Sequence, residues 1–245
     1  MPVLVYTDFD QTMIQENSPK ILGKEMLRFY KKTFGWLFIF GNLPKILYQS
    51  VLYQITGKTE HFYRVFFYFD ENALQRVVQQ LTLNPRWLAA LQDIRRREGG
   101  DVEITLVIIS RNLIGLIRRF VKQPSIKKEF AALSCRVREI IAHADILADG
   151  ETIITAGVWR SGMKEPMIDA RGLASRMISR QELRTVSVLT VMPYREYTAK
   201  IMGAIGKNKH LYLQKGEEAS VYYIGDAEEK YLIGKGIPKE RFYQV

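Results

Sequence analysis

Short apolar runs rich in β-branched and aromatic residues stand out along this chain. Three of them, at residues 3–6, 104–109 and 221–224, stop abruptly at polar residues. Runs of this length predict strands that are buried on both faces, as in a parallel sheet. A further apolar stretch at 184–191 predicts another strand, and residues 152–159 have β-like composition.

Helical periodicity fills much of the sequence between these runs. Apolar residues recur at helix spacing in four segments, at residues 71–81, 88–97, 113–121 and 197–205. Ser110 stands between a strand and the third of these helices, which predicts a helix N-cap. The alternation of strands and helices favours an α/β fold with a mainly parallel sheet.

A long helical insert separates the first two strands. We expect residues 1–16 and 88–245 to form the α/β core and residues 17–87 to form a separate helical unit. The most apolar part of the insert is residues 34–55. Polar residues interrupt it, so it predicts a buried helix or one that rests on a membrane surface, rather than a clean spanning helix.

The polar residues that end the apolar runs predict a site. Carboxyl ends of neighbouring parallel strands meet at one edge of a sheet, so Asp8, Asp10, Ser110 and Asp226 are expected to converge there. Two carboxylates two residues apart can bind Mg²⁺. One carboxylate can attack phosphorus, and the other can act as acid and base. A hydroxyl, a lysine and the metal can neutralise phosphate charge.

These residues resemble the motifs of the haloacid dehalogenase (HAD) superfamily. VLVYTDFDQT resembles the first motif, which implies that Asp8 is the nucleophile and Asp10 the general acid and base. ITLVIIS resembles the second motif and implies that Ser110 binds phosphate. VYYIGDAEEKYLI resembles the fourth and implies that Asp226 is a metal ligand. By the same resemblance Mg²⁺ binds Asp8, the main-chain carbonyl of Asp10, and Asp226.

The third motif is a lysine at a helix start. Lys200 in YTAKIMGAI fits it best, with Lys207 and Lys209 as alternatives. Thr12 and Asn112 are expected to complete the phosphate-binding site.

The fourth motif departs from the family pattern. Many members carry a further aspartate where this chain has Lys230. The resemblance implies that Glu228 or Glu229 takes over the role of orienting metal-bound water. Asp10, at the second position of the first motif, implies a phosphatase or phosphomutase rather than a dehalogenase or ion-pumping ATPase. The insert resembles the helical cap of the phosphoserine-phosphatase-like subgroup, which closes over the site and selects the substrate.

Composition and charge narrow the classes of protein, partner and location to consider. Hydrophobic residues make up 47% of the chain and charged residues 25%, as in soluble globular proteins. The net charge of +10 attracts phosphate esters, nucleic acid or anionic lipid. The basic clusters are scattered and lack interleaved aromatic residues, so a nucleic-acid groove is not expected. The N-terminus lacks a signal-peptide pattern, so a cytoplasmic location is expected. Cys135 is the single cysteine, which excludes an internal disulfide; we expect it to be a packing residue.

Three functions remain open at this point. The first is a Mg²⁺-dependent phosphatase acting on a phosphorylated small molecule or phosphoprotein. The second is a HAD-like binding or regulatory module with weakened catalysis, supported by Lys230. The third is a membrane-associated phosphatase or regulator that makes peripheral contact through residues 34–55 and the basic surface.

Overall fold

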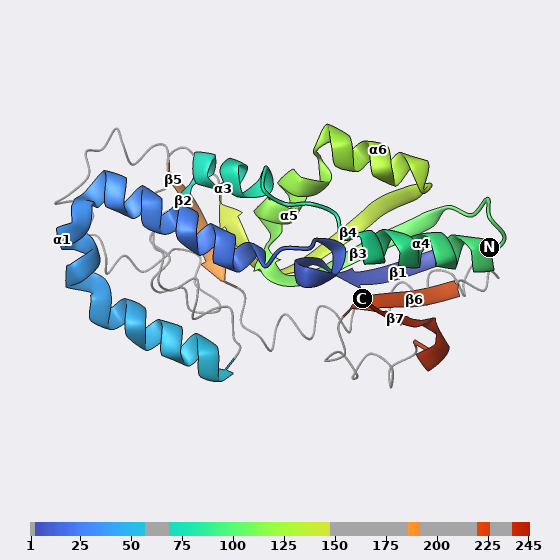
Figure 1. Cartoon of the computed structure of the whole chain (residues 1–245), viewed down its shortest axis with the longest axis horizontal. Helices are drawn as coiled ribbons and strands as arrows, with labels where there is room; N and C mark the ends of the chain where they lie inside the picture. Colours follow the sequence, from blue (N-terminus) through green and yellow to red (C-terminus); the bar gives the residue numbers. More distant parts are fainter. Residues whose placement is uncertain (1–2, 57–68, 148–185, 192–219, 226–236) are drawn as a thin grey trace.

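The computed structural model describes residues 3–56, 69–147, 186–191, 220–225 and 237–245. Within these residues a seven-stranded sheet has the order β2-β5-β4-β3-β1-β6-β7 (Figure 1). Its strands are β1 (Val3–Asp8), β2 (Phe69–Asp70), β3 (Ile104–Leu113), β4 (Cys135–Leu147), β5 (Val186–Val191), β6 (Ser220–Gly225) and β7 (Phe242–Gln244).

The sheet is mainly parallel. Strands β4, β3, β1, β6 and β7 pair in parallel, whereas β5 runs antiparallel to β4 and β2 antiparallel to β5. The predicted α/β fold with a mainly parallel sheet is therefore confirmed. β1 lies between β3 and β6, so the chain leaves it toward one side and returns on the other. The carboxyl end of such a strand is where open α/β sheets bind ligands.

Helices cover one face of this sheet. α4 (Pro85–Arg97), α5 (Ile114–Val121) and α6 (Pro124–Ala132) lie along it, and α3 (Glu71–Val78) lies beside α5 (Figure 1). α1 (Ser18–Thr56) extends beyond the sheet at one end of the molecule. A short π-type turn (Phe9–Met13) follows β1, and a 3₁₀ turn (Lys239–Arg241) precedes β7.

Period-two alternation explains how β1 is buried on both faces. Val3 and Val5 belong to the core cluster under the helices, whereas Leu4 and Tyr6 pack in a second cluster on the opposite face. Trp87 of α4 is fully buried in the first cluster, and its indole N–H donates to the Thr7 hydroxyl at 2.8 Å. This contact satisfies a buried donor and fixes α4 against the end of β1.

Several predicted elements are confirmed with shifted ends. The helix expected at 88–97 begins at Pro85, because the Asn84 side chain accepts from the Arg86 N–H at 3.0 Å. The helix expected at 71–81 ends at Val78. β4, α6 and β7 were not predicted. Residues 152–159 and 197–205 lie outside the described residues.

The prediction that Ser110 caps a helix is wrong. β3 continues past Ser110 to Leu113, since its pairing with β4 extends through the partners Ser110–Ala142 and Leu113–Ala144. Leu113 is the N-cap of α5 and makes no side-chain capping bond. With the backbone extended, the Ser110 hydroxyl makes a different local contact, with the Asn112 N–H.

The described part of the insert contains α1, β2 and α3. α1 packs against α3, and β2 pairs with β5 at the edge of the sheet. The buried Glu25 of α1 accepts from Arg76 of α3 at 2.9 Å and also pairs with Arg28. None of the helices in the described residues has the length and apolar character needed to cross a bilayer.

Candidate active site

Asp8 ends β1, the middle strand of the parallel part of the sheet, and the chain reverses immediately after it. The turn Phe9–Met13 is closed by the Ile14 N–H, which donates to the Phe9 carbonyl at 3.0 Å. Gln11 adopts the left-handed conformation at φ 57° and ψ 7°, which is uncommon for a residue other than glycine. The buried Thr12 then places its hydroxyl 3.5 Å from Asp8 Oδ2. The turn thus returns Thr12 to the carboxylate at the strand end.

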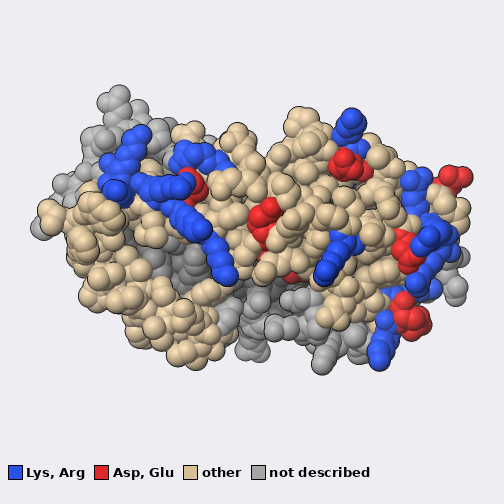
Figure 2. All heavy atoms as spheres, in the orientation of Figure 1, with Lys and Arg blue, Asp and Glu red and all other residues tan. Residues whose placement is uncertain are grey.

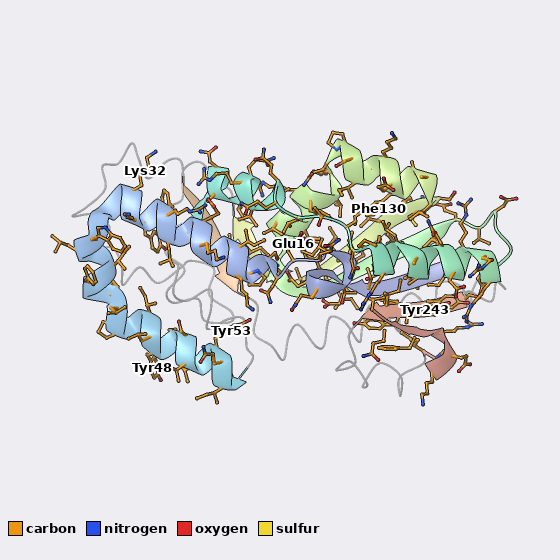
Figure 3. All side chains as sticks on the ribbon, viewed as in Figure 1. Glu16, Lys32, Tyr48, Tyr53, Phe130 and Tyr243 are labelled. Carbon is orange, nitrogen blue, oxygen red and sulfur yellow. The ribbon has the colours of Figure 1, made fainter. Side chains whose placement is uncertain are left out.

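The loop between α3 and α4 forms hydrogen bonds with the segment that follows this turn. The Glu16 carboxylate accepts from the Thr82 N–H at 3.0 Å and from the Thr82 hydroxyl at 2.6 Å. The Gln15 N–H donates to the Thr82 carbonyl at 3.1 Å, and the Asn84 N–H donates to the Met13 carbonyl at 2.9 Å. Glu16 lies just before α1, close to the turn after β1 (Figure 3). These bonds hold the turn between α1 and α4.

Asp10 accepts three hydrogen bonds from two buried residues. Its Oδ1 accepts from the Ser18 N–H at 2.8 Å and the Ser18 hydroxyl at 2.5 Å. Its Oδ2 accepts from Asn112 Nδ2 at 2.9 Å. Ser18 is the first residue of α1, so the carboxylate satisfies an N–H at the helix start and lies at the positive end of the helix dipole.

The orientation of the Asn112 amide follows from its partners. Its Oδ1 accepts from the Leu113 N–H at 2.7 Å, so Nδ2 faces Asp10 and also donates to the Ser18 hydroxyl oxygen. The Ser18 hydroxyl therefore accepts from Asn112 and donates to Asp10. Asn112 and Ser18 are 1% and 0% exposed, so this network is shielded from water. Donors aimed at a carboxylate favour its charged form.

Ser110 lies beside the end of β1. Asp8 pairs with Ile109 of β3, and Ser110 is the next residue along that strand. Its hydroxyl oxygen accepts from the Asn112 N–H at 3.1 Å, and the side chain is 1% exposed. The structure therefore brings Asp8, Asp10 and Ser110 to one edge of the sheet, as expected from the sequence, and their chemical roles remain predictions.

The structure describes the side chain of Asn112, but it does not describe the remaining predicted site residues. The side chain of Asn112, expected at the phosphate, contacts Asp10 and Ser18 in this structure. β6 pairs with β1 and ends at Gly225, directly before Asp226. Asp226 itself lies outside the described residues, as do Lys200, Lys207, Lys209, Glu228 and Glu229.

The donors at the strand end suit a hard cation. In the part of the chain that the structure describes, no three His, Cys, Asp or Glu side chains gather closely enough to hold a metal. Asp8 and Asp10 supply oxygen donors only, and Mg²⁺ prefers oxygen and is commonly bound by one or two carboxylates plus phosphate. The residues present therefore fit Mg²⁺ better than a metal that prefers sulfur or nitrogen.

Cys135 is remote from this edge. It begins β4 and pairs with Ile104, the first residue of β3, so it lies at the opposite end of the parallel strands. Burial raises the pKa of its thiol to about 12. A thiol that stays protonated at neutral pH is a poor nucleophile, as the sequence predicts.

Ser18 was not among the residues singled out from the sequence. The pair Ser18-Pro19 does carry a helix-start signal, since serine favours N-terminal capping positions and proline the first turn. Its contact with a carboxylate eight residues earlier depends on the turn at Gln11, which no local pattern indicates.

Comparison with known proteins gives structural neighbours only. No protein-family model matches the chain, and no curated protein matches it. One similar solved structure is a HAD family hydrolase, t0658, from Salmonella enterica subsp. enterica serovar Typhi, with 13% identity and a TM-score of 0.47; the match covers 100% of this chain and 68% of that one.

Phosphoserine phosphatase is another neighbour. Its phospho-aspartyl intermediate analogue matches 96% of this chain and 83% of its own, at 9% identity and a TM-score of 0.47. A substrate-bound complex matches 100% and 93%, at 10% identity and a TM-score of 0.44. At such values the likeness is one of overall shape, and a function for this chain has to come from its own residues.

Proposed function

We propose that this chain is a Mg²⁺-dependent phosphatase that hydrolyses a phosphate monoester of a small molecule or phosphoprotein. Asp8 is the nucleophile and Asp10 the general acid and base. The observation that supports the proposal is the pair of carboxylates at the end of β1, close to the Ser110 end of the neighbouring strand β3. Asp10 is held in one orientation by hydrogen bonds from Ser18 and Asn112.

In the first step an Asp8 carboxylate oxygen attacks phosphorus. The bond between phosphorus and the leaving oxygen breaks, and protonated Asp10 gives its proton to that oxygen. Asp10 becomes a carboxylate, whose oxygens accept hydrogen bonds from Ser18 and Asn112. The product is an aspartyl-phosphate on Asp8.

In the second step Asp10 acts as a base. It removes a proton from water, the water oxygen attacks phosphorus, and the bond to Asp8 breaks to release phosphate. Asp10 ends protonated and is ready for another cycle. The fixed Asn112 amide and Ser18 hydroxyl keep the carboxylate in one orientation through both steps, which phosphoryl transfer requires.

Other residues of the chain complete the site in this proposal. Ser110 binds a phosphoryl oxygen through its hydroxyl, with Thr12 beside Asp8 and Lys200 as the predicted cation. Asp8, the Asp10 carbonyl and Asp226 would hold Mg²⁺, which when bound supplies positive charge to the phosphoryl oxygens. Glu228 or Glu229 would orient the bound water.

The test measures phosphate release from p-nitrophenyl phosphate and from a panel of phosphorylated metabolites and phosphopeptides, with Mg²⁺ and with EDTA. We expect Mg²⁺-dependent release that Asp8→Asn reduces by at least about a thousandfold. Borohydride reduction of the quenched enzyme should convert phosphorylated Asp8 to homoserine, detected by peptide mass spectrometry.

Asp10→Asn is the matched variant because it changes the other carboxylate of the pair. It should still form the aspartyl-phosphate from a substrate with a good leaving group, and then hydrolyse it slowly. Turnover that is unaffected by Asp8→Asn would contradict the proposal. A binding function that survives Asp8→Asn, without any turnover, would favour the weakened regulatory module instead.

A further inference from the structure

α1 is interrupted at Gly35, and a separate helical segment follows. Gly35 has φ 75° and ψ 175°, outside helical geometry. We call residues 36–56, which come after this break, the α1 arm. In Figure 1 the arm turns back from the first segment at the end of the molecule farthest from α4.

The arm exposes an unusual number of large apolar side chains. Leu37 is 86% exposed and Ile55 76% exposed, and both are far above what a packed leucine or isoleucine shows. The exposed set on the arm is Trp36, Leu37, Phe40, Leu43, Leu47, Tyr48, Val51 and Ile55. Contiguous apolar exposure of this kind marks an interaction surface.

These side chains share one side of the helix. At 100° per residue, the positions from Trp36 to Ile55 in the exposed set fall on an arc of roughly 140°. Ile39 and Ile46 lie on the other side and pack against the main core cluster. Tyr48 and Tyr53 point from opposite sides of the arm (Figure 3), and Tyr48 is 62% exposed. The arm therefore has one anchored side and one exposed apolar side.

Positive charge adjoins this apolar side. The whole of α1 contains six Lys or Arg residues and one acid, Glu25, which is buried and paired with Arg28 and Arg76. The exposed basic residues of the first segment are Lys20, Lys24, Arg28, Lys31 and Lys32. Figure 2 shows blue side chains gathered over that segment, while the surface of the arm is tan. Lys31 Nζ lies 4.7 Å from the ring centroid of the exposed Trp36, where the two regions meet.

We propose that the α1 arm docks this protein on a bilayer surface that contains anionic lipid. A helix with an apolar side, interfacial Trp and Tyr rings and adjacent Lys and Arg residues has the features of one that lies in the membrane interface. Each basic residue near an anionic surface adds attraction. The only acid of α1, Glu25, is buried, so the exposed charge beside the apolar side is positive and complements an anionic bilayer surface.

The test is vesicle flotation of the full chain. Wild-type protein should float with vesicles of phosphatidylcholine and phosphatidylglycerol, and much less with phosphatidylcholine alone. The variant Leu37→Glu/Leu47→Glu/Val51→Glu should lose at least about tenfold in vesicle-bound fraction, because it puts charge on the apolar side. These positions are exposed, and circular dichroism will verify that the variant keeps its helices.

Two charge-reversal variants sharpen the result. Lys31→Glu/Lys32→Glu should reduce binding to anionic vesicles severalfold. Lys127→Glu/Lys128→Glu makes the same change on exposed residues of α6 and should bind like wild type. Asp8→Asn should also float like wild type, because docking is independent of the proposed catalysis.

Three results would overturn the proposal. The first is no flotation with either vesicle. The second is equal loss for the two lysine pairs, which would mean diffuse electrostatic adsorption. The third is lipid-free self-association that the triple glutamate variant abolishes, which would assign the arm to a second copy of the chain.

Discussion

The two segments of α1 have the same helical backbone and opposite surroundings. The first segment, residues 18–34, buries Leu22, Met26 and Tyr30 in the core, and its first residue holds Asp10. The arm, residues 36–56, leaves most of its large apolar side chains in contact with solvent. One helix thus serves the candidate active site at its start and a surface at its end.

The difference shows that hydrophobicity alone does not predict burial. The arm is the more apolar segment by sequence, yet the first segment is the one that packs. What anchors the first segment is a set of specific polar bonds at Ser18 and Glu25, together with buried apolar residues that recur every four residues.

The largest expected effect is at the start of the first segment. Ser18→Ala and Asn112→Ala each remove buried donors to Asp10, and we expect each to lower kcat by about 10- to 100-fold with little change in KM. Steady-state kinetics will measure kcat and KM for each variant.

Ser18→Thr is the control, since it keeps the hydroxyl and should recover most of the lost rate. The effects of Ser18→Ala and Asn112→Ala should be less than additive in the double variant, because the two side chains belong to one network. A rise in KM with an unchanged kcat would mean that Ser18 does not position Asp10 for the reaction.

The sequence predicts the sheet well because its strands are continuous apolar runs. Residues 104–109 and 221–224 are strands for the reason expected, which is burial on both faces. β4 escaped prediction because CRVREIIAHADIL mixes charged and apolar residues, and its many parallel contacts with β3 are non-local. Tertiary pairing decided its structure.

The residues of the candidate site at the strand ends were predictable from the sequence, but the contacts that orient Asp10 were not. Asp8 and Ser110 were found because each follows an apolar run. The contacts that orient Asp10 come from Ser18 and from Asn112, 102 residues away along the chain. They depend on a left-handed turn at Gln11, which sequence patterns do not predict for a glutamine.

Glu25→Gln tests the anchor between α1 and α3. The glutamate is 3% exposed, and losing its charge-assisted bonds to Arg76 and Arg28 should lower the free energy of unfolding by about 2 kcal/mol. The hydrogen bond from Arg76 is the main cause that lowers the pKa of Glu25 below 4.5. Chemical denaturation followed by circular dichroism will measure the loss.

The pH dependence of this anchor has a definite sign. Because folding lowers the pKa of Glu25, its contribution is complete above 4.5 and is lost as pH falls through the lower folded value. The difference between wild type and Glu25→Gln should therefore shrink in acid. Glu129→Gln on the exposed side of α6 is the control and should show no such difference. A difference that is constant with pH would mean that packing, not charge, anchors the segment.

Gly35→Ala tests the joint between the two segments. An alanine Cβ there meets no atom within 4 Å, so the expected loss of about 1–2 kcal/mol comes from the backbone conformation alone. Gly41→Ala is the matched control, since it lies in the helical arm with equally open space and should stabilise by about 0.5–1 kcal/mol. If Gly35→Ala is neutral and increases helicity, the two segments can form one straight helix.

The smallest effect is expected at Gln11, which like Gly35 has a positive φ angle. The joint at Gly35 uses a glycine, whereas the turn beside Asp10 holds a glutamine at φ 57°. Gln11→Gly removes a left-handed cost of roughly 1–2 kcal/mol and adds roughly 0.5–1 kcal/mol of unfolded-state entropy. It should therefore stabilise by less than about 1 kcal/mol, whereas the β-branched Gln11→Val should destabilise.

Thermal unfolding will show whether each Gln11 variant is more or less stable than wild type. Steady-state kinetics on the same variants will show whether the change in stability affects catalysis. Greater stability with lower kcat would indicate that the strained turn helps to place Asp10, and greater stability with unchanged kcat would indicate that Ser18 and Asn112 suffice.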